Sequence, residues 1–219
     1  MDTQSSSENA LYAARCIADL AVNEGVLDAE IACRPTYDHM GAVLADSVLQ
    51  AGLNYSTVVK PRVHSILQSF PHARTVNVLV EIIALEGSGK FLQWAHHEKT
   101  ARFEALVEFL VSVQIHDTIE LRNALSEDTF KEDIRGIHGV GPKTVDYMAC
   151  LVGADCIAVD RHIRGFASCA GIEHDEYDYL KDAFCFAADL LDISRREFDA
   201  WVWNYQSERS RNQLVFNFI

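Results

Sequence analysis

Apolar side chains recur along this chain at intervals of three and four residues, the spacing that places them on one face of a helix. Four early segments show it, through Leu11, Ile17, Leu20 and Ala21; Val43, Leu44 and Leu49; Val58, Val63, Ile66 and Leu67; and Val76, Leu79, Val80 and Ile83. The same pattern predicts a long amphipathic helix over 97–115 and further helices over 118–125, 129–135, 142–152, 160–169, 176–191 and 194–207. The sequence has no convincing stretch with the two-residue period of a strand, so we expect an all-α fold.

Polar residues indicate where several of these helices begin. Thr36 after Pro35, Ser56, and Thr75 after Pro71 each stand just before an apolar periodic segment. Ser194 is followed three residues later by Glu197, which is the pattern of a capping box.

Residues 134–144 read Ile-Arg-Gly-Ile-His-Gly-Val-Gly-Pro-Lys-Thr and predict a helix, a hairpin and a second helix within 128–153. Gly139 and Gly141 allow positive φ and a close approach to the backbone. Pro142 suits the first position of a helix, where its missing N–H is no loss. Backbone N–H groups at such a turn and helix N-terminus point outward and suit a phosphate.

A second motif, Val-Asp-Arg-His-Ile at 159–163, places Asp160 seventeen residues after Lys143. Together the two motifs resemble the helix-hairpin-helix DNA glycosylases, over roughly residues 40–166. In the lyase branch of that family, which includes endonuclease III and the 8-oxoguanine glycosylases, the lysine is the nucleophile and the aspartate its electrostatic partner. The resemblance assigns these roles to Lys143 and Asp160.

The resemblance also implies an architecture. The chain would form one glycosylase unit over 1–219, with two helical lobes flanking a DNA-binding groove. Residues 37–155, including the hairpin region 128–153, would form one lobe, and 1–36 with 156–219 the other.

Further site residues follow from the family pattern. Gly139, Gly141, Arg161 and His162 are expected to contact DNA, and a structural histidine is an equal alternative for His162. The hairpin would hold Na⁺ or K⁺ through backbone carbonyls, those of Arg135, Ile137 and Val140. The sequence departs from the family at His138, where proline is usual, at Arg161, where a small residue is usual, and at Arg164, which stands one residue early.

The segment 50–60, Gln-Ala-Gly-Leu-Asn-Tyr-Ser-Thr-Val-Val-Lys, resembles the bacterial 3-methyladenine glycosylase branch. It suggests that Gln50 fills the gap left by a flipped nucleotide and that Tyr55 stacks on a base. The alternatives are that Gln50 ends a helix and that Tyr55 is a core aromatic.

The net charge of −13 is opposite to the usual basic footprint of a nucleic-acid-binding protein. Most of the acid lies outside the motif region, because residues 60–164 hold twelve Lys and Arg against fourteen Asp and Glu. The flanking parts, 1–59 and 165–219, carry net charges of −6 and −5. We therefore expect weak, salt-sensitive binding to double-stranded DNA that contains a damaged or abasic nucleotide.

The six cysteines include no Cys-x-x-Cys pair, and only Cys169 and Cys185 follow Asp160. The four-cysteine iron–sulfur cluster of endonuclease III is therefore not expected, and no other cofactor is predicted. With no apolar run long enough for a membrane span and no secretory signal, we expect a soluble, cytoplasmic monomer, associated with the nucleoid in a bacterium.

The leading hypothesis is a base-excision repair DNA glycosylase with abasic-site lyase activity through a Lys143 Schiff base. The helix N-terminus beside Lys143 should favour the neutral, nucleophilic amine. One alternative is a monofunctional glycosylase for alkylated bases, in which Asp160 activates water and Lys143 only contacts phosphate. Another is a non-catalytic helix-hairpin-helix module that binds DNA or a basic protein. The residues do not identify which damaged base is excised.

Overall fold

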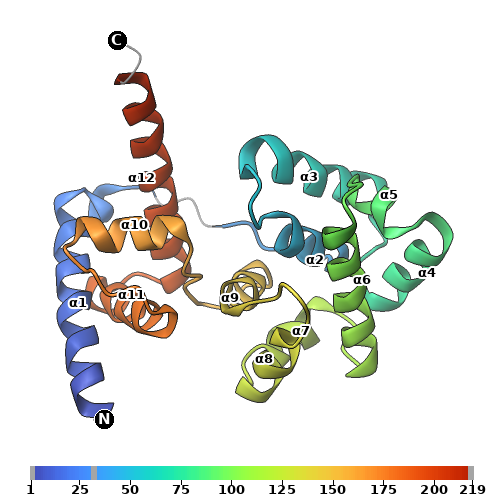
Figure 1. Cartoon of the computed structure of the whole chain (residues 1–219), viewed down its shortest axis with the longest axis horizontal. Coiled ribbons are helices and arrows are strands. Elements are labelled where there is room, and N and C mark those ends of the chain that lie inside the picture. The colour runs from blue at the N-terminus through green and yellow to red at the C-terminus, as the bar shows by residue number, and fades with distance from the viewer. Residues whose placement is uncertain (1–2, 31–33, 217–219) are drawn as a thin grey trace. The chain divides into compact units, whose positions relative to one another are not determined.

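The computed structural model of the protein describes residues 3–30 and 34–216, which contain helices, turns and loops but no strand (Figure 1). The all-α prediction is therefore confirmed for this part of the chain. The chain divides into two compact units, one made of Met1–Arg34 with Asp155–Ile219 and the other of Pro35–Ala154. The groove expected between two lobes stays a prediction.

The Pro35–Ala154 unit is built around one helix that is buried on every side. Its elements are α2 (Met40–Leu49), η2 (Tyr55–Val59), α3 (Lys60–Ser69), α4 (Val76–Glu86), α5 (Ser88–Leu92), α6 (His97–Ser112), α7 (Thr118–Ala124), α8 (Asp128–Arg135) and α9 (Pro142–Leu151). All ten residues of α2 are buried, and α3, α4, α6 and α9 pack against it. A helix that is almost entirely apolar is stable only when its neighbours cover it completely.

The start of α2 corrects one expectation. The sequence suggested a helix start at Thr36, but α2 begins at Met40. His39 caps it, because its Nδ1 accepts a hydrogen bond of 3.0 Å from the Ala42 N–H while its Nε2 donates to the Phe70 carbonyl at 2.8 Å. Burial lowers the pKa of His39, which favours the neutral ring that this cap requires.

The other unit contains α1 (Thr3–Asn23), η1 (Val26–Asp28), α10 (Arg161–Cys169), α11 (Tyr177–Leu191) and α12 (Arg195–Phe216). Helix α1 lies along α11, and α10 packs on α12 (Figure 1). Phe166, Phe184 and Phe198 are fully buried at the centre of the apolar core that these helices share.

Helix α12 begins as its sequence indicated. The Glu197 N–H donates to Ser194 Oγ at 3.2 Å, and the Ser194 N–H donates to the Glu197 carboxylate at 3.2 Å, so the predicted capping box is confirmed. Farther along α12, Trp201 is buried and stacks on Tyr205 with ring centroids 5.4 Å apart. Trp201 therefore serves the core of this unit.

No helix in the described part of the chain has the length and apolar character needed to cross a membrane.

Candidate functional site

Helix α8 ends at Arg135, α9 begins at Pro142, and residues 136–141 connect them in a tight turn. Inside the turn, the Val140 N–H donates to the Ile137 carbonyl at 2.9 Å. Pro142 occupies the first turn of α9, where its lack of an N–H leaves no hydrogen bond unmade.

The two glycines of this turn differ in conformation. Gly139 has φ of 81°, which only glycine adopts without strain. Gly141 is extended, with φ of −104°, and a Cβ placed there would meet no described heavy atom within 4 Å. Positive φ is thus needed at Gly139 alone, while Gly141 keeps open space beside its backbone.

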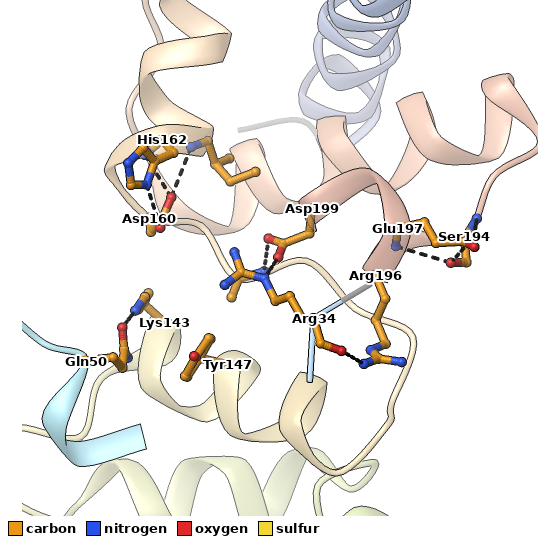
Figure 2. A network of polar contacts seen from close by, with 12 residues as sticks. Arg34, Gln50, Lys143, Tyr147, Asp160, His162, Ser194, Arg196, Glu197 and Asp199 are labelled. Carbon is orange, nitrogen blue, oxygen red and sulfur yellow. Dashed lines mark hydrogen bonds and ion pairs between the residues drawn. The ribbon is translucent and has the colours of Figure 1, made fainter. Parts of the chain in front are cut away.

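Lys143 lies in the first turn of α9, and its ammonium donates to the side-chain oxygen of Gln50 (Figure 2). The same Nζ lies 4.8 Å from the ring centroid of Tyr147, one helical turn farther along α9. Two residues selected from separate sequence motifs, Gln50 and Lys143, are therefore in direct contact. Gln50 also ends α2, where its backbone N–H donates to the Asp46 carbonyl at 3.0 Å, as one of its two interpretations predicted.

Tyr147 links this pair to a carboxylate, that of Asp46, which accepts hydrogen bonds from three tyrosines. Asp46 on α2 is fully buried and accepts hydrogen bonds from Tyr147 at 3.0 Å, Tyr37 at 3.0 Å and Tyr55 at 3.5 Å. Burial, together with the charge of Asp46, raises the pKa of Tyr37, so its phenol stays a donor. Tyr55 is half-buried and also packs on the apolar cluster around Val59, which supports its core interpretation.

Helix α6 supports both segments that carry the candidate residues. Lys99 Nζ donates to the carbonyls of Val48 at 2.9 Å and Ala51 at 2.8 Å, at the end of α2. Burial, followed by the charge of Arg102, lowers the pKa of Lys99. Arg102, nearly one turn farther along α6, donates from Nε to the His138 carbonyl at 3.1 Å in the turn before α9.

In the other unit, Asp160 caps α10. One carboxylate oxygen accepts from the N–H groups of His162 at 2.8 Å and Ile163 at 3.1 Å, and the other lies 3.2 Å from His162 Nδ1. Burial alone would raise the pKa of Asp160. The bonds from His162 and Ile163 and the charge of Arg34 outweigh it and lower the pKa to about 2. Asp160 is therefore an anion at neutral pH.

His162 is held on three sides. Besides Asp160, its Nε2 lies 3.5 Å from Ser207 Oγ and its ring lies 5.4 Å from that of Trp203. Only 11% of the side chain is exposed, which supports the structural interpretation of His162. Arg161, the first residue of α10, is exposed.

A buried ion pair lies near Asp160. Arg34 Nε donates to Asp199, whose side chain is fully buried, and the Arg34 carbonyl accepts from Arg196 at 2.7 Å (Figure 2). Burial raises the pKa of Asp199, and Arg34 opposes that change. The ion pair with Asp199 and the hydrogen bond from Arg196 connect Arg34 to α12.

Among the predicted carbonyl ligands, Arg135 is the exposed last residue of α8, and Val140 is buried within the turn. Within residues 3–30 and 34–216, no group of three or more His, Cys, Asp or Glu side chains is arranged to hold a metal ion.

Sequence reasoning missed Asp46 and Tyr147 as members of this site, and it did not predict that Lys99 and Arg102 donate to the backbone carbonyls of the two segments. One signal was available, because Asp46 is the only charged residue in the apolar stretch 40–49 and a lone buried acid requires partners. Nothing local to Lys99 or Arg102 distinguishes them from solvated helix charges.

Comparison of the chain with protein-family models, with curated proteins and with solved structures found no match.

Proposed function

We propose that this protein is a DNA glycosylase with abasic-site lyase activity, in which Lys143 is the nucleophile. The observation that carries the proposal is the contact between Gln50 and Lys143. Each was selected from a different motif, as gap filler and as nucleophile, and a flipped nucleotide requires both functions at one place on the duplex.

The turn before α9, together with α8 and α9, would act as a helix-hairpin-helix that binds the DNA backbone. The open space beside Gly141 and the N-terminus of α9 suit a phosphate oxygen. The carbonyls of Arg135, Ile137 and Val140 would hold a monovalent cation, and Ile137 retains a lone pair for it after accepting from the Val140 N–H. Bound there, Na⁺ or K⁺ would supply positive charge near a phosphate. Arg102 adds a positive charge at the neighbouring His138 carbonyl.

In the proposed reaction, the neutral amine of Lys143 attacks C1′ of the flipped nucleotide. The bond between C1′ and the base breaks, and the base leaves with the bonding electron pair and takes up a proton. After loss of the amine proton and opening of the sugar ring, the lysine and C1′ are joined as a Schiff base. Loss of a C2′ proton then expels the 3′ phosphate by β-elimination.

Asp160 would stabilise the positive charge that develops on the sugar. Its low pKa keeps the carboxylate ionised throughout the neutral range. The capping bonds from His162 and Ile163 fix its orientation before substrate arrives, which is the condition for electrostatic stabilisation without reorganisation.

The test is borohydride trapping on a duplex with one abasic site, scored as a covalent protein–DNA adduct. We expect an adduct with the native protein and none with Lys143→Gln, which should still bind the duplex. An adduct at native yield in Lys143→Gln would overturn the assignment. Base release from damaged duplexes without any adduct would instead support a monofunctional glycosylase that uses Asp160 to activate water, and neither product would support a non-catalytic module.

A further inference from the structure

Only one of the two polar atoms of the Gln50 side-chain amide has a hydrogen-bond partner in the described part of the chain. Its oxygen accepts a hydrogen bond from Lys143, but its Nε2 is buried and has no hydrogen-bond partner among the described residues. An unpaired buried donor is unfavourable, because it has lost its hydrogen bonds to water and gained none in the protein. A position that leaves this donor unpaired is a poor one for a residue whose only task is to end α2.

We propose that Gln50 holds Lys143 as an unreactive ammonium in the free protein and releases it when Gln50 moves into DNA. This inference rests on the proposed function and extends it, because it makes insertion of the gap-filling residue the step that frees the nucleophile. Gln50 is thus a positioning residue that couples base flipping to chemistry.

The contacts of Lys143 explain why release is needed. An amide oxygen and the face of an aromatic ring both favour the charged form of an amine, and Lys143 contacts one of each, on Gln50 and Tyr147. An ammonium has no lone pair and cannot attack C1′. Removing the Gln50 oxygen therefore raises the neutral fraction of the amine.

Two charged side chains near this contact also influence whether Lys143 is an ammonium or a neutral amine, and they do so in opposite directions. Tyr147 lies on the same helix as Lys143 and donates to the Asp46 carboxylate on α2, whose negative charge also favours the ammonium. On the α6 side, Lys99 lies at the Ala51 carbonyl, beside the Gln50 backbone, and its positive charge opposes the ammonium. These groups are unchanged when Gln50 is substituted, so the effect of Gln50 can be measured separately.

The unpaired Nε2 supplies the reason for Gln50 to leave. A gap in a duplex presents base-edge acceptors that this donor can meet, while the Gln50 oxygen can accept from a base amino group. Both polar atoms of the amide are then satisfied, whereas among the residues that the structure describes only the oxygen has a partner. The Gln50 Nε2, which lacks a hydrogen bond to any of these residues, therefore favours insertion of Gln50 into the duplex.

The first test needs no DNA. Reductive methylation of the full-length protein with formaldehyde and cyanoborohydride is followed at Lys143 by peptide mass spectrometry from pH 6 to 10, with Lys131 as internal reference. We expect Gln50→Leu to methylate Lys143 about threefold to tenfold faster than native protein at pH 7.5, with the pH midpoint shifted downward. Gln50→Glu, whose carboxylate favours the ammonium, shifts the midpoint upward. Equal midpoints at Lys143 in all three proteins would overturn the inference, and a shift shared by Lys131 would mark a general disturbance of the fold and overturn it too.

The second test uses borohydride trapping on a duplex and on a single strand, each with one abasic site. Native protein should trap the duplex several-fold faster, because only a duplex offers a gap for Gln50. Gln50→Leu should lose most of that ratio through faster trapping of the single strand. An unchanged ratio would overturn the coupling while leaving the proposed function intact. Absence of any adduct with native protein, with the methylation midpoints still displaced, would overturn the proposed function and with it the coupling to DNA.

Discussion

The guanidinium of Arg102 occupies the space that a side chain on Gly139 would need. Arg102 Nη2 would lie 1.9 Å from a Cβ placed on Gly139. Arg102 Nε also donates to the carbonyl of His138, the residue that precedes Gly139. The turn before α9 is therefore fixed from the α6 side by a charged hydrogen bond, at the one residue of the turn with positive φ.

This arrangement makes the two glycines of the turn respond differently to alanine. Gly139→Ala strains the backbone and displaces Arg102, so we expect a loss of about 1–2 kcal/mol in the free energy of unfolding. Gly141→Ala, at an extended residue with open space, should change it by less than about 0.5 kcal/mol. Urea unfolding monitored by circular dichroism measures both.

Gly141→Ala also distinguishes an effect on stability from an effect on DNA binding. If the open side of Gly141 receives a phosphate, Gly141→Ala should weaken DNA binding several-fold at low salt although the protein remains as stable as the native form. Equal stability losses for the two variants would contradict the conformations of this turn, and native binding by Gly141→Ala would contradict the phosphate position.

The carboxylate of Asp46 allows a comparison between two of its tyrosine donors. Tyr147→Phe removes a 3.0 Å hydrogen bond to a fully buried charge and should cost about 1.5–3 kcal/mol of unfolding free energy. Tyr55→Phe removes a 3.5 Å bond from a half-buried ring and should cost less than about 1 kcal/mol. Denaturant titration of both variants gives the order of the two losses, and a larger loss for Tyr55→Phe would contradict the ranking of these two hydrogen bonds by length and burial.

Helical periodicity located most of the helices, because a helix that buries one face repeats its apolar residues every three or four positions, and this repeat is visible in the local sequence. Boundaries such as Pro142 and Ser194 were predictable, since proline and a capping box act on neighbouring residues. The start of α2 was not, because the His39 cap depends on a bond to Phe70, far along the chain.

In the candidate site, too, the sequence predicts what depends on neighbouring residues and does not predict contacts between distant ones. Lys143 and Gln50 stand in recognisable motifs, but their contact spans 93 residues and could not be deduced from spacing. Lys99, Arg102 and the tyrosines around Asp46 act through tertiary contacts alone. A lone acid in an apolar helix predicts that partners exist without identifying them.

Lys99 should be important for both stability and the position of Gln50. Lys99→Met keeps the aliphatic stem but removes the donor to the Val48 and Ala51 carbonyls, so we expect a loss of about 1–3 kcal/mol in unfolding free energy. Under the proposed function, abasic-site trapping should also fall several-fold. Lys90→Met is the control, because Lys90 forms an exposed ion pair with Glu86 and the substitution should change stability by less than about 0.5 kcal/mol. Native stability in Lys99→Met would show that the end of α2 needs no support from α6.

The ionised cap of α10 predicts a specific acid response. Because the pKa of Asp160 is lowered to about 2 in the folded protein, against about 3.9 for an unfolded aspartate, its charge stabilises the fold above pH 5, and this contribution is lost as the pH falls through 2. Asp160→Asn retains a capping oxygen but no charge, so it should be less stable than native protein by about 2 kcal/mol at pH 6. The difference should shrink to about 0.5 kcal/mol or less near pH 2, where about half of the native carboxylate is protonated. Urea unfolding of both proteins at intervals between pH 6 and 2 gives this difference directly, and a gap that stayed constant over the range would mean that His162 and the α10 amides do not depend on the charge of Asp160.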